Sequence, residues 1–370
     1  MKKIVISGVN MVQGGILTIY QDVIRSLGNK VDCEVFCLVH DESLFNELPK
    51  YNNVRYISFP EVKKSWIKRL AFEFYTSRFL SKKIKPDIWL SLHDISAFVD
   101  VKVQYVYCHN PSPFYRAGFS DFKLDKKFFL FTKFYKYLYR LNIKSNKNVF
   151  VQQKWIAENF KRWYGINNLI VAKPEYKKNF NAMPSTIIND KYIFLYPSVP
   201  RVFKNYEVII NAMEYLRVYN ADVYNKVEIH LTFNYGINSV GDYFMEKVKN
   251  KKLSQIKFIG FLSKPDLVNK YANLTDALLF PSKLETWGLP ISEAKNFGLP
   301  ILLPDLPYAY ETAGDYKKVA YFKCDDYIGL AMQITSFLES KQVYSDRTVS
   351  DEDDFFELDN WDDFASFILK

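Results

Sequence analysis

Residues 278–298 read LLFPSKLETWGLPISEAKNFG and contain three predicted elements in a fixed order. The apolar run 277–280 is closed by Pro281, which is typical of a buried strand that ends in a turn. Pro290 stands where a helix favours proline as its first residue, and Gly298 stands where a helix often ends. The stretch therefore predicts a strand, a loop and a short helix. In an open α/β sheet, ligands bind at this end of a strand.

Two acidic residues, Glu285 and Glu293, flank the start of the predicted helix. The backbone N–H groups of Gly288, Leu289 and Ile291 at this helix N-terminus are expected to be free and suit a phosphate. A carboxylate in the first turn can also simply complement the helix dipole, and for Glu293 alone both interpretations stay open. Glu285 lies in an apolar, tryptophan-bearing loop, where the dipole does not explain it. An anion site flanked by two acids suits a ligand with both phosphates and hydroxyls, such as a sugar nucleotide.

The spacing of these two acids carries a family resemblance. Glu285-x7-Glu293 lies within FPS-x-x-E-x-x-G-L-P-x-x-E-A, followed by G-L-P-I, and this resembles the signature of retaining glycosyltransferases of family 4. The resemblance implies the α/β GT-B fold, in which two Rossmann-like domains face each other across a cleft and a C-terminal helix crosses back to the first domain. It implies that Glu285 holds the donor sugar's hydroxyls and Glu293 the ribose hydroxyls. The donor diphosphate would lie at the helix start, beside Gly288, Leu289, Pro290 and Ile291.

The length of 370 residues and the hydrophobic share of 48% suggest two domains with sizeable cores. We expect an acceptor-side domain over 1–172, joined by the terminal helix 356–370, and a donor-binding domain over 173–355. The polar stretch 165–184 is predicted as the interdomain linker, and the acidic run 351–354 as a solvated linker.

The cysteines, histidines and apolar runs indicate which cofactors and which cell compartment to expect. The four cysteines form no CxxC pair and the four histidines show no metal-ligand spacing, so we predict no disulfide framework, no metal and no other cofactor. No apolar run approaches the length of a membrane span, and the start MKKIVISGVN is strand-like rather than a signal peptide. We expect a cytoplasmic protein.

The charge is unevenly distributed along the chain. Residues 61–178 contain 24 lysines and arginines against nine acids, whereas the remainder contains 26 against 32. Residues 126–147 interleave aromatics with cations and contain no acid. A helix of this kind suits an anionic lipid surface, while single-stranded nucleic acid and a core-packing helix with a solvated basic face are alternatives. We favour the membrane surface, on the inner face of the plasma membrane, and expect no nucleic acid.

The first half alternates short apolar strands with helical patterns, which predicts a Rossmann-like parallel sheet. Gly14 and Gly15 follow its first strand and allow a ligand to approach the backbone, although a plain strand-to-helix turn also explains them. In family 4 the corresponding loop lies beside the donor phosphates and the acceptor.

His109 and Asn110 follow a strand predicted over 102–107. A lone histidine at a strand end is often structural. The family has a histidine here, close to the donor sugar and the reacting centre, so the resemblance implies a catalytic role for His109. Asp94 stands one strand earlier and is a candidate acceptor ligand or an ordinary turn residue.

Two cations lie in the loop between a strand over 192–196 and a helix over 206–219. Arg201 and Lys204 oppose the preference of a helix N-terminus for negative charge, whereas a bound diphosphate explains both. The family has an Arg and a Lys here for the donor diphosphate, with glycine common where this chain has Asn205. The resemblance also places the nucleobase near Phe261 and Leu262.

The resemblance therefore implies a retaining, metal-independent glycosyltransferase that moves a hexose or deoxyhexose from a nucleotide sugar to a glycan hydroxyl. An acceptor linked to undecaprenyl diphosphate, as in bacterial O-antigen or capsule synthesis, is the family's commonest setting and fits the basic region. The alternatives are another GT-B sugar-nucleotide enzyme, such as an inverting transferase or an epimerase, and a basic nucleic-acid-binding protein. The donor sugar, the base and the linkage stay open.

Overall fold

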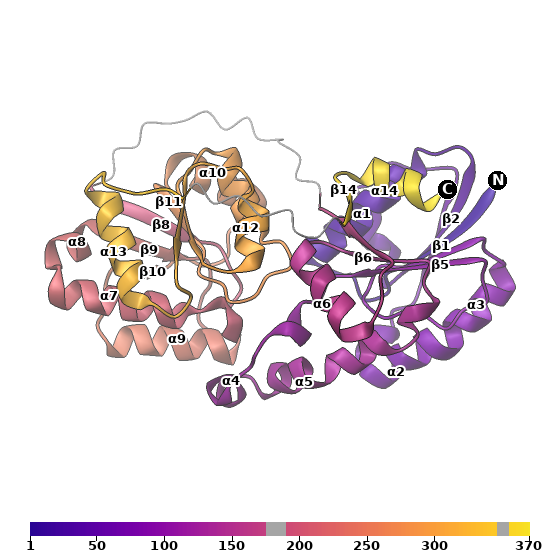
Figure 1. The fold of residues 1–370 in the computed structure, drawn as a ribbon, viewed down its shortest axis with the longest axis horizontal. Helices are drawn as coiled ribbons and strands as arrows, with labels where there is room; N and C mark the ends of the chain where they lie inside the picture. The colour runs from indigo at the N-terminus through magenta and orange to yellow at the C-terminus, as the bar shows by residue number, and fades with distance from the viewer. Residues whose placement is uncertain (175–189, 346–354) are drawn as a thin grey trace. The chain divides into compact units, whose positions relative to one another are not determined.

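A computed structural model describes residues 1–174, 190–345 and 355–370 (Figure 1). The chain forms two compact units. Unit 1 comprises Met1–Phe114, Thr132–Glu175 and Glu352–Lys370, and unit 2 comprises Tyr115–Phe131 and Tyr176–Asp351. In the part of the chain that the structure describes, no helix has both the length and the apolar character needed to cross a membrane.

Unit 1 is built on an eight-stranded parallel sheet with the order β14-β7-β6-β5-β4-β1-β2-β3. The strands are short, apolar and buried, as expected for a parallel sheet covered on both faces. Their bounds are β1 Lys2–Ser7, β2 Cys33–Val39, β3 Val54–Ser58, β4 Ile88–Ser91, β5 Val103–Cys108, β6 Asn148–Val151, β7 Leu169–Ala172 and β14 Phe356–Leu358. Because all strands run the same way, the loops after β1, β4, β5 and β6 meet at one edge.

Helices of unit 1 cover the two faces of this sheet (Figure 1). Their bounds are α1 Gly14–Gly28, α2 Trp66–Ala71, α3 Ser77–Ile84, α5 Lys126–Arg140, α6 Lys154–Tyr164 and α14 Trp361–Ile368. Helices α2 and α3 are joined by a π-helical segment, Phe72–Thr76. By contact, α5 begins in unit 2 and ends in unit 1.

The end of the chain returns to unit 1, which confirms the crossing-back helix. β14 pairs in parallel with β7, and α14 lies beside α1 (Figure 1). Phe364 is fully buried in the core, with its ring 4.7 Å from that of Phe150 and 6.0 Å from that of Tyr107.

Unit 2 contains a six-stranded parallel sheet with the order β10-β9-β8-β11-β12-β13. The strands are β8 Tyr192–Tyr196, β9 Val227–Leu231, β10 Ile256–Phe258, β11 Ala277–Leu279, β12 Ile301–Pro304 and β13 Val319–Phe322. The chain moves outward from β8 through β9 to β10 and then resumes at β11 on the other side of β8. Neighbouring β8 and β11 therefore form the topological switch point, where α/β sheets bind ligands.

The helices of unit 2 follow its strands in alternation. Their bounds are α4 Phe119–Leu124, α7 Tyr206–Tyr219, α8 Ala221–Lys226, α9 Ser239–Asn250, α10 Lys264–Asn273, α11 Leu289–Asn296, α12 Pro307–Ala313 and α13 Tyr327–Leu338. The segment Tyr115–Phe131, which we had placed in the first domain, lies with unit 2. The rings of Tyr115 and Phe128 contact Phe203 there, at 6.5 and 5.2 Å.

The predicted linker over 165–184 was wrong at its start. Residues Leu169–Ala172 form β7, whose four residues are all buried. This run of four apolar residues is too short to show periodicity, but it adds to the edge of a sheet already formed. Residues 175–184 and the acidic run 351–354 lie outside the described residues.

Candidate active site

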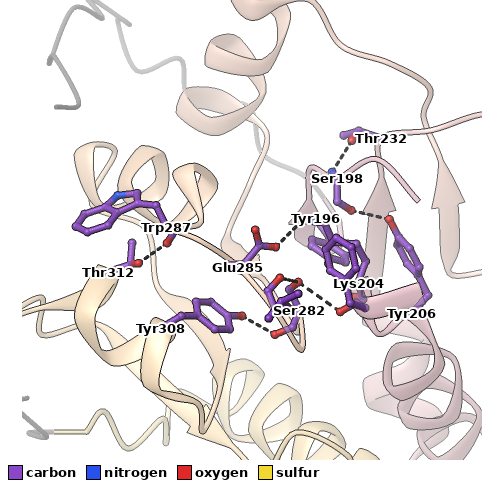
Figure 2. A network of polar contacts seen from close by, with 12 residues as sticks. Tyr196, Ser198, Lys204, Tyr206, Thr232, Ser282, Glu285, Trp287, Tyr308 and Thr312 are labelled. Carbon is purple, nitrogen blue, oxygen red and sulfur yellow. Dashed lines mark hydrogen bonds and ion pairs between the residues drawn. The ribbon is translucent and has the colours of Figure 1, made fainter. Parts of the chain in front are cut away.

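Lys204 and Glu285 face each other at the switch point of unit 2 (Figure 2). Lys204 ends a short turn after β8, and Glu285 lies in the loop after β11. Lys204 Nζ is 2.5 Å from Glu285 Oε1, and the two side chains are only 14% and 15% exposed. The ammonium also lies 5.3 Å from the ring centre of Phe280. Partial burial strengthens electrostatic interactions at this point relative to open water.

The loop that carries Lys204 is fixed by the residue after it. Asn205 has a φ of 57°, a left-handed conformation that asparagine and glycine tolerate best. Its side-chain amide donates to the carbonyl oxygens of Pro281 and Cys324, at 3.2 and 2.8 Å. The Tyr196 hydroxyl donates to the carbonyl oxygen of Lys204 at 2.8 Å. Asparagine thus supplies both the backbone conformation and two anchoring contacts.

The loop that carries Glu285 is held by α12 (Figure 2). The Tyr308 hydroxyl donates to the carbonyl oxygen of Ser282 at 2.6 Å, and the Thr312 hydroxyl donates to that of Trp287. The indole N–H of Trp287 donates to Ser292 Oγ at 3.0 Å. Both ends of the loop are therefore anchored. Tyr308 and Thr312 were not predicted from the sequence, because they lie in α12, which follows β12, whereas the Glu285 loop follows β11.

Arg201 lies in the same turn as Lys204, whose backbone N–H donates to the Arg201 carbonyl at 3.0 Å. The Arg201 side chain is exposed and makes no ion pair with the described residues. The two predicted diphosphate cations thus lie in the same turn. Lys204 is paired with Glu285, whereas the side chain of Arg201 is available to a ligand.

The start of α11 is a tight turn built on glycine. Gly288 has a φ of 83°, and a Cβ there would meet Ile291 Cδ1 at 3.0 Å. The Ile291 amide donates to the Gly288 carbonyl at 2.9 Å, so our interpretation of it as a free phosphate donor was wrong. The tight turn uses the Ile291 N–H for its own hydrogen bond, and Pro290 has no N–H. The amides of Gly288 and Leu289 remain the candidate donors.

Glu293 lies half-buried in α11 and accepts a hydrogen bond from the Tyr271 hydroxyl at 3.1 Å. Burial raises the pKa of its carboxyl, against the opposing effects of Tyr271 and Lys264. Tyr271 belongs to α10, the helix that follows Phe261 and Leu262. Phe261 is 84% exposed, which leaves its ring open to a flat ligand. These predicted ribose and base residues thus lie on connected elements.

In unit 1, His109 is buried at the end of β5. The Gln152 side-chain amide is 3.1 Å from His109 Nδ1, and the ring stacks on Tyr107 with centroids 4.5 Å apart. Burial lowers the pKa of His109 to about 4, although the charge of Asp94 opposes this. The imidazole is therefore neutral near pH 7. Asp94 Oδ1 accepts from the backbone N–H groups of His109 and Asn110, at 2.6 and 3.1 Å, so these three predicted residues are in contact.

The predicted glycine loop begins α1. Gly14 has a φ of 67° and no atom within 4 Å of where a Cβ would lie, and Gly15 follows as the second helical residue. A backbone this open is compatible with a ligand as well as with a plain turn.

A buried polar cluster beside this loop was missed from the sequence. Ser7 Oγ is 3.0 Å from His93 Nε2, and Glu73 Oε1 is 3.3 Å from the same nitrogen. Burial raises the pKa of Glu73 to about 8 and lowers that of His93 well below its ordinary value. Glu73 was not predicted as a buried residue, because a single acid within a helical pattern rich in cations is typical of a solvent-exposed position. In the structure it lies in the π-helical segment Phe72–Thr76.

Helix α5 carries the predicted basic aromatic region. Phe134 and Tyr137 are 61% and 56% exposed, and Leu130 and Leu141 are also exposed. These positions recur at helical spacing and form one stripe on the solvent side. On its other side α5 buries Thr132, Tyr135 and Tyr139, as a core-packing helix with a solvated basic face also would. Six lysines and arginines accompany the stripe, namely Lys126, Lys127, Lys133, Lys136, Arg140 and Lys144.

Residues 177–349 match the family described as "Glycosyl transferases group 1". The matched residues lie in unit 2. This agrees with the Lys204–Glu285 site at its switch point. No curated protein sequence matches the chain.

Solved structures show the same fold over almost the whole chain. The lipopolysaccharide outer core galactosyltransferase WaaB, in its apo form, is 15% identical with a TM-score of 0.65, and each chain is fully covered. Sucrose-phosphate synthase from Thermosynechococcus elongatus is 14% identical with a TM-score of 0.67, over 92% of this chain and 90% of the other. HepE from Anabaena, in complex with UDP and glucose, is 14% identical with a TM-score of 0.63, over 99% and 95%. The fold is GT-B, as predicted.

Proposed function

We propose that the protein is a glycosyltransferase that moves a sugar from a nucleotide-diphosphate donor to a hydroxyl of a glycan acceptor. The observation that carries this proposal is the ion pair between Lys204 and Glu285 at the switch point of a glycosyl transferases group 1 domain. Without donor, each charge balances the other. When the donor is bound, the ammonium of Lys204 pairs with the diphosphate and the carboxylate of Glu285 accepts hydrogen bonds from the sugar hydroxyls.

The remaining donor contacts follow from the loops around this pair. Arg201 has an available guanidinium in the same turn as Lys204 and would fork onto the diphosphate. The amides of Gly288 and Leu289 add N–H donors at a helix N-terminus. Glu293 would accept hydrogen bonds from the ribose hydroxyls, and the base would lie against Phe261 and Leu262.

In the reaction, the bond between the sugar's anomeric carbon and the diphosphate oxygen breaks. The acceptor oxygen forms the new bond, and its proton passes to the leaving phosphate. Negative charge grows on that phosphate, where Lys204, Arg201 and the fixed amides stabilise it, so we propose transfer without a metal cofactor. Attack from the face that the phosphate leaves would retain the anomeric configuration. We assign His109, as a neutral imidazole, to the donor sugar at the reacting centre.

The acceptor is proposed to be a lipid-linked glycan, with undecaprenyl diphosphate as the carrier. Gly14, Gly15 and Asn110 are its candidate contacts. Support comes from α5, whose exposed stripe, including Phe134 and Tyr137, and basic flanks suit an anionic lipid surface. We therefore propose that the protein acts on the inner face of the plasma membrane, in the synthesis of a bacterial surface polysaccharide.

A test begins with a thermal-shift screen of UDP-, GDP-, dTDP- and CMP-sugars, followed by turnover with the best donor. We expect Glu285→Gln and Lys204→Ala each to abolish transfer while the variants stay folded. Lys251→Ala, which breaks a surface pair with Glu214 elsewhere in unit 2, is the matched control and keeps turnover. Normal turnover by either site variant contradicts the assignment.

Two further measurements separate the alternatives. NMR of the product distinguishes retention from inversion at the anomeric carbon, and it identifies an epimerase by the absence of a new glycosidic bond. A gel-shift assay with single-stranded nucleic acid tests the remaining rival, for which the Lys204–Glu285 pair has no role.

A further inference from the structure

The carboxylate of Asp94 is surrounded by four hydrogen-bond donors from its own unit. Oδ1 accepts from the backbone N–H of His109 at 2.6 Å, from that of Asn110 at 3.1 Å and from the Tyr139 hydroxyl at 3.0 Å. Oδ2 accepts from the Tyr135 hydroxyl at 2.9 Å. Asp94 is thus engaged internally on both oxygens.

These donors distinguish Asp94 from an ordinary turn aspartate. A turn aspartate accepts from backbone groups about two residues ahead. The donors to Asp94 lie between 15 and 45 residues further along the chain. They come from two elements, the loop after β5 and helix α5. Asp94 therefore joins the His109 loop to α5.

The two tyrosines that contact Asp94 are buried. Tyr135 and Tyr139 are only 2% and 1% exposed. The Tyr139 hydroxyl is also within hydrogen-bond distance of the backbone of Asn110, 3.1 Å from its nitrogen and 2.9 Å from its oxygen. Asp94 itself is half-buried, and a carboxylate that is partly removed from water is costly unless it is hydrogen-bonded. Loss of one donor therefore shifts the groups that share it, and the His109 loop is the less regular partner.

We propose that Asp94 is a positioning residue for His109, and that Tyr135 and Tyr139 set its position from helix α5. The proposal rests on the function proposed above for His109. It replaces a direct contact of Asp94 with the acceptor, because the four internal donors already occupy its carboxylate.

The backbone at Asp94 allows a clean variant. Its φ is 77°, in the left-handed region that asparagine tolerates as well as aspartate does. Asp94→Asn keeps the backbone and the size but leaves one oxygen and an amide that cannot accept. Tyr139→Phe and Tyr135→Phe each remove one hydroxyl and leave Asp94 intact. Tyr137→Phe, on the exposed side of the same helix, is the matched control.

The first readout is the position of His109 itself. The protein has four histidines, so the ring ¹⁵N–¹H resonances can be assigned individually in the full-length protein. We expect the His109 ring signals to move in Asp94→Asn and Tyr139→Phe, while those of His40 and His230 stay in place. Tyr137→Phe should leave all of them unchanged. Unchanged His109 signals in both site variants would overturn the proposal, and Tyr139→Phe serves if Asp94→Asn does not fold.

The second readout is kinetic. Since the proposed donor-diphosphate contacts lie in unit 2, kcat should fall roughly 10- to 100-fold in Asp94→Asn, as for a displaced reacting group, with the donor KM unchanged. Displaced His109 signals with full kcat would also overturn the proposal. Failure of the proposed function shows separately, as absence of transfer by the wild-type protein with every donor. The ring signals then decide alone whether Asp94 holds His109.

Discussion

Replacing Glu73 by glutamine tests the electrostatics of the core of unit 1. Glu73 is fully buried, and neither of its carboxylate oxygens accepts a hydrogen bond from a described residue. Its pKa rises from 4.5 to about 8, mainly because burial disfavours the charged form, while Arg69 opposes the shift. The folded protein therefore keeps this proton at neutral pH, whereas the unfolded chain releases it.

The sign and size of the effect follow from proton linkage. The stabilising contribution is complete below pH 4.5 and is lost as the pH rises to about 8. Within this range the free energy of unfolding falls by about 1.4 kcal/mol per pH unit. His93, which lies against Glu73, acts in the opposite direction, but its contribution is complete above 6.5, because its folded pKa is lower still. The pKa values of His109 and His230 are lowered as well. Between pH 6.5 and 8.5 Glu73 therefore contributes a fall of about 2 kcal/mol in the free energy of unfolding. The four cysteines, whose thiol pKa values burial raises above 9.0, lower the stability further toward pH 8.5, but equally in wild type and variant.

Urea unfolding followed by tryptophan fluorescence measures this slope. Five of the six tryptophans (66, 89, 155, 163 and 361) lie in unit 1, so the signal reports mainly on that unit. Between pH 6.5 and 8.5 we expect the wild type to lose about 2 kcal/mol more than Glu73→Gln, in which a neutral isostere replaces the carboxyl. Glu61→Gln, an exposed residue of unit 1, is the control and should keep the wild-type slope. Equal slopes for wild type and Glu73→Gln would refute the reasoning.

Three further outcomes are expected. Asn205→Gly keeps the left-handed backbone but loses two side-chain hydrogen bonds, whereas Asn205→Ala loses the hydrogen bonds and also strains the backbone. Thermal unfolding should therefore rank the stability of wild type above that of the glycine variant and the glycine variant above the alanine variant, which should lose about 1–3 kcal/mol. An alanine variant as stable as wild type would contradict this. Binding to anionic vesicles should weaken with added salt and fall in a Phe134→Ser, Tyr137→Ser double variant but not in Lys251→Ala, and equal binding to neutral vesicles would exclude the lipid surface. Glu293→Gln should raise the dissociation constant for a nucleoside diphosphate roughly tenfold in calorimetry, as loss of a charged hydrogen-bond acceptor does, and an unchanged constant would remove Glu293 from the ribose site.

The sequence predicts the fold class because alternating buried strands and helices admit few parallel arrangements. It also predicts that Lys204 and Glu285 follow strand ends, since short apolar runs and prolines mark those ends. Their contact depends on β8 and β11 being neighbours, and this comes from the strand order rather than from the order along the chain. The family resemblance, rather than the local sequence pattern, predicted that these two residues share a site.

The residues that the sequence did not reveal share one property: their contacts are distant along the chain. Glu73 lies in a π-helical segment and meets His93, which follows β4, and Tyr308 reaches the Glu285 loop from the next strand's helix. Asp94 looked like a turn residue because its four donors are spread over two elements. The free amide expected at Ile291 failed for a local reason, since the tight glycine turn before α11 uses it.

The central claim is that Lys204 and the start of α11 bind the donor diphosphate while Glu285 and Glu293 bind hydroxyls. A crystal structure with the nucleoside diphosphate that stabilises the protein most tests it directly. We predict a phosphate oxygen about 3 Å from Lys204 Nζ and from the Gly288 or Leu289 amide, with the ribose hydroxyls on Glu293. A nucleotide bound elsewhere, with the Lys204–Glu285 pair still closed, would contradict the account.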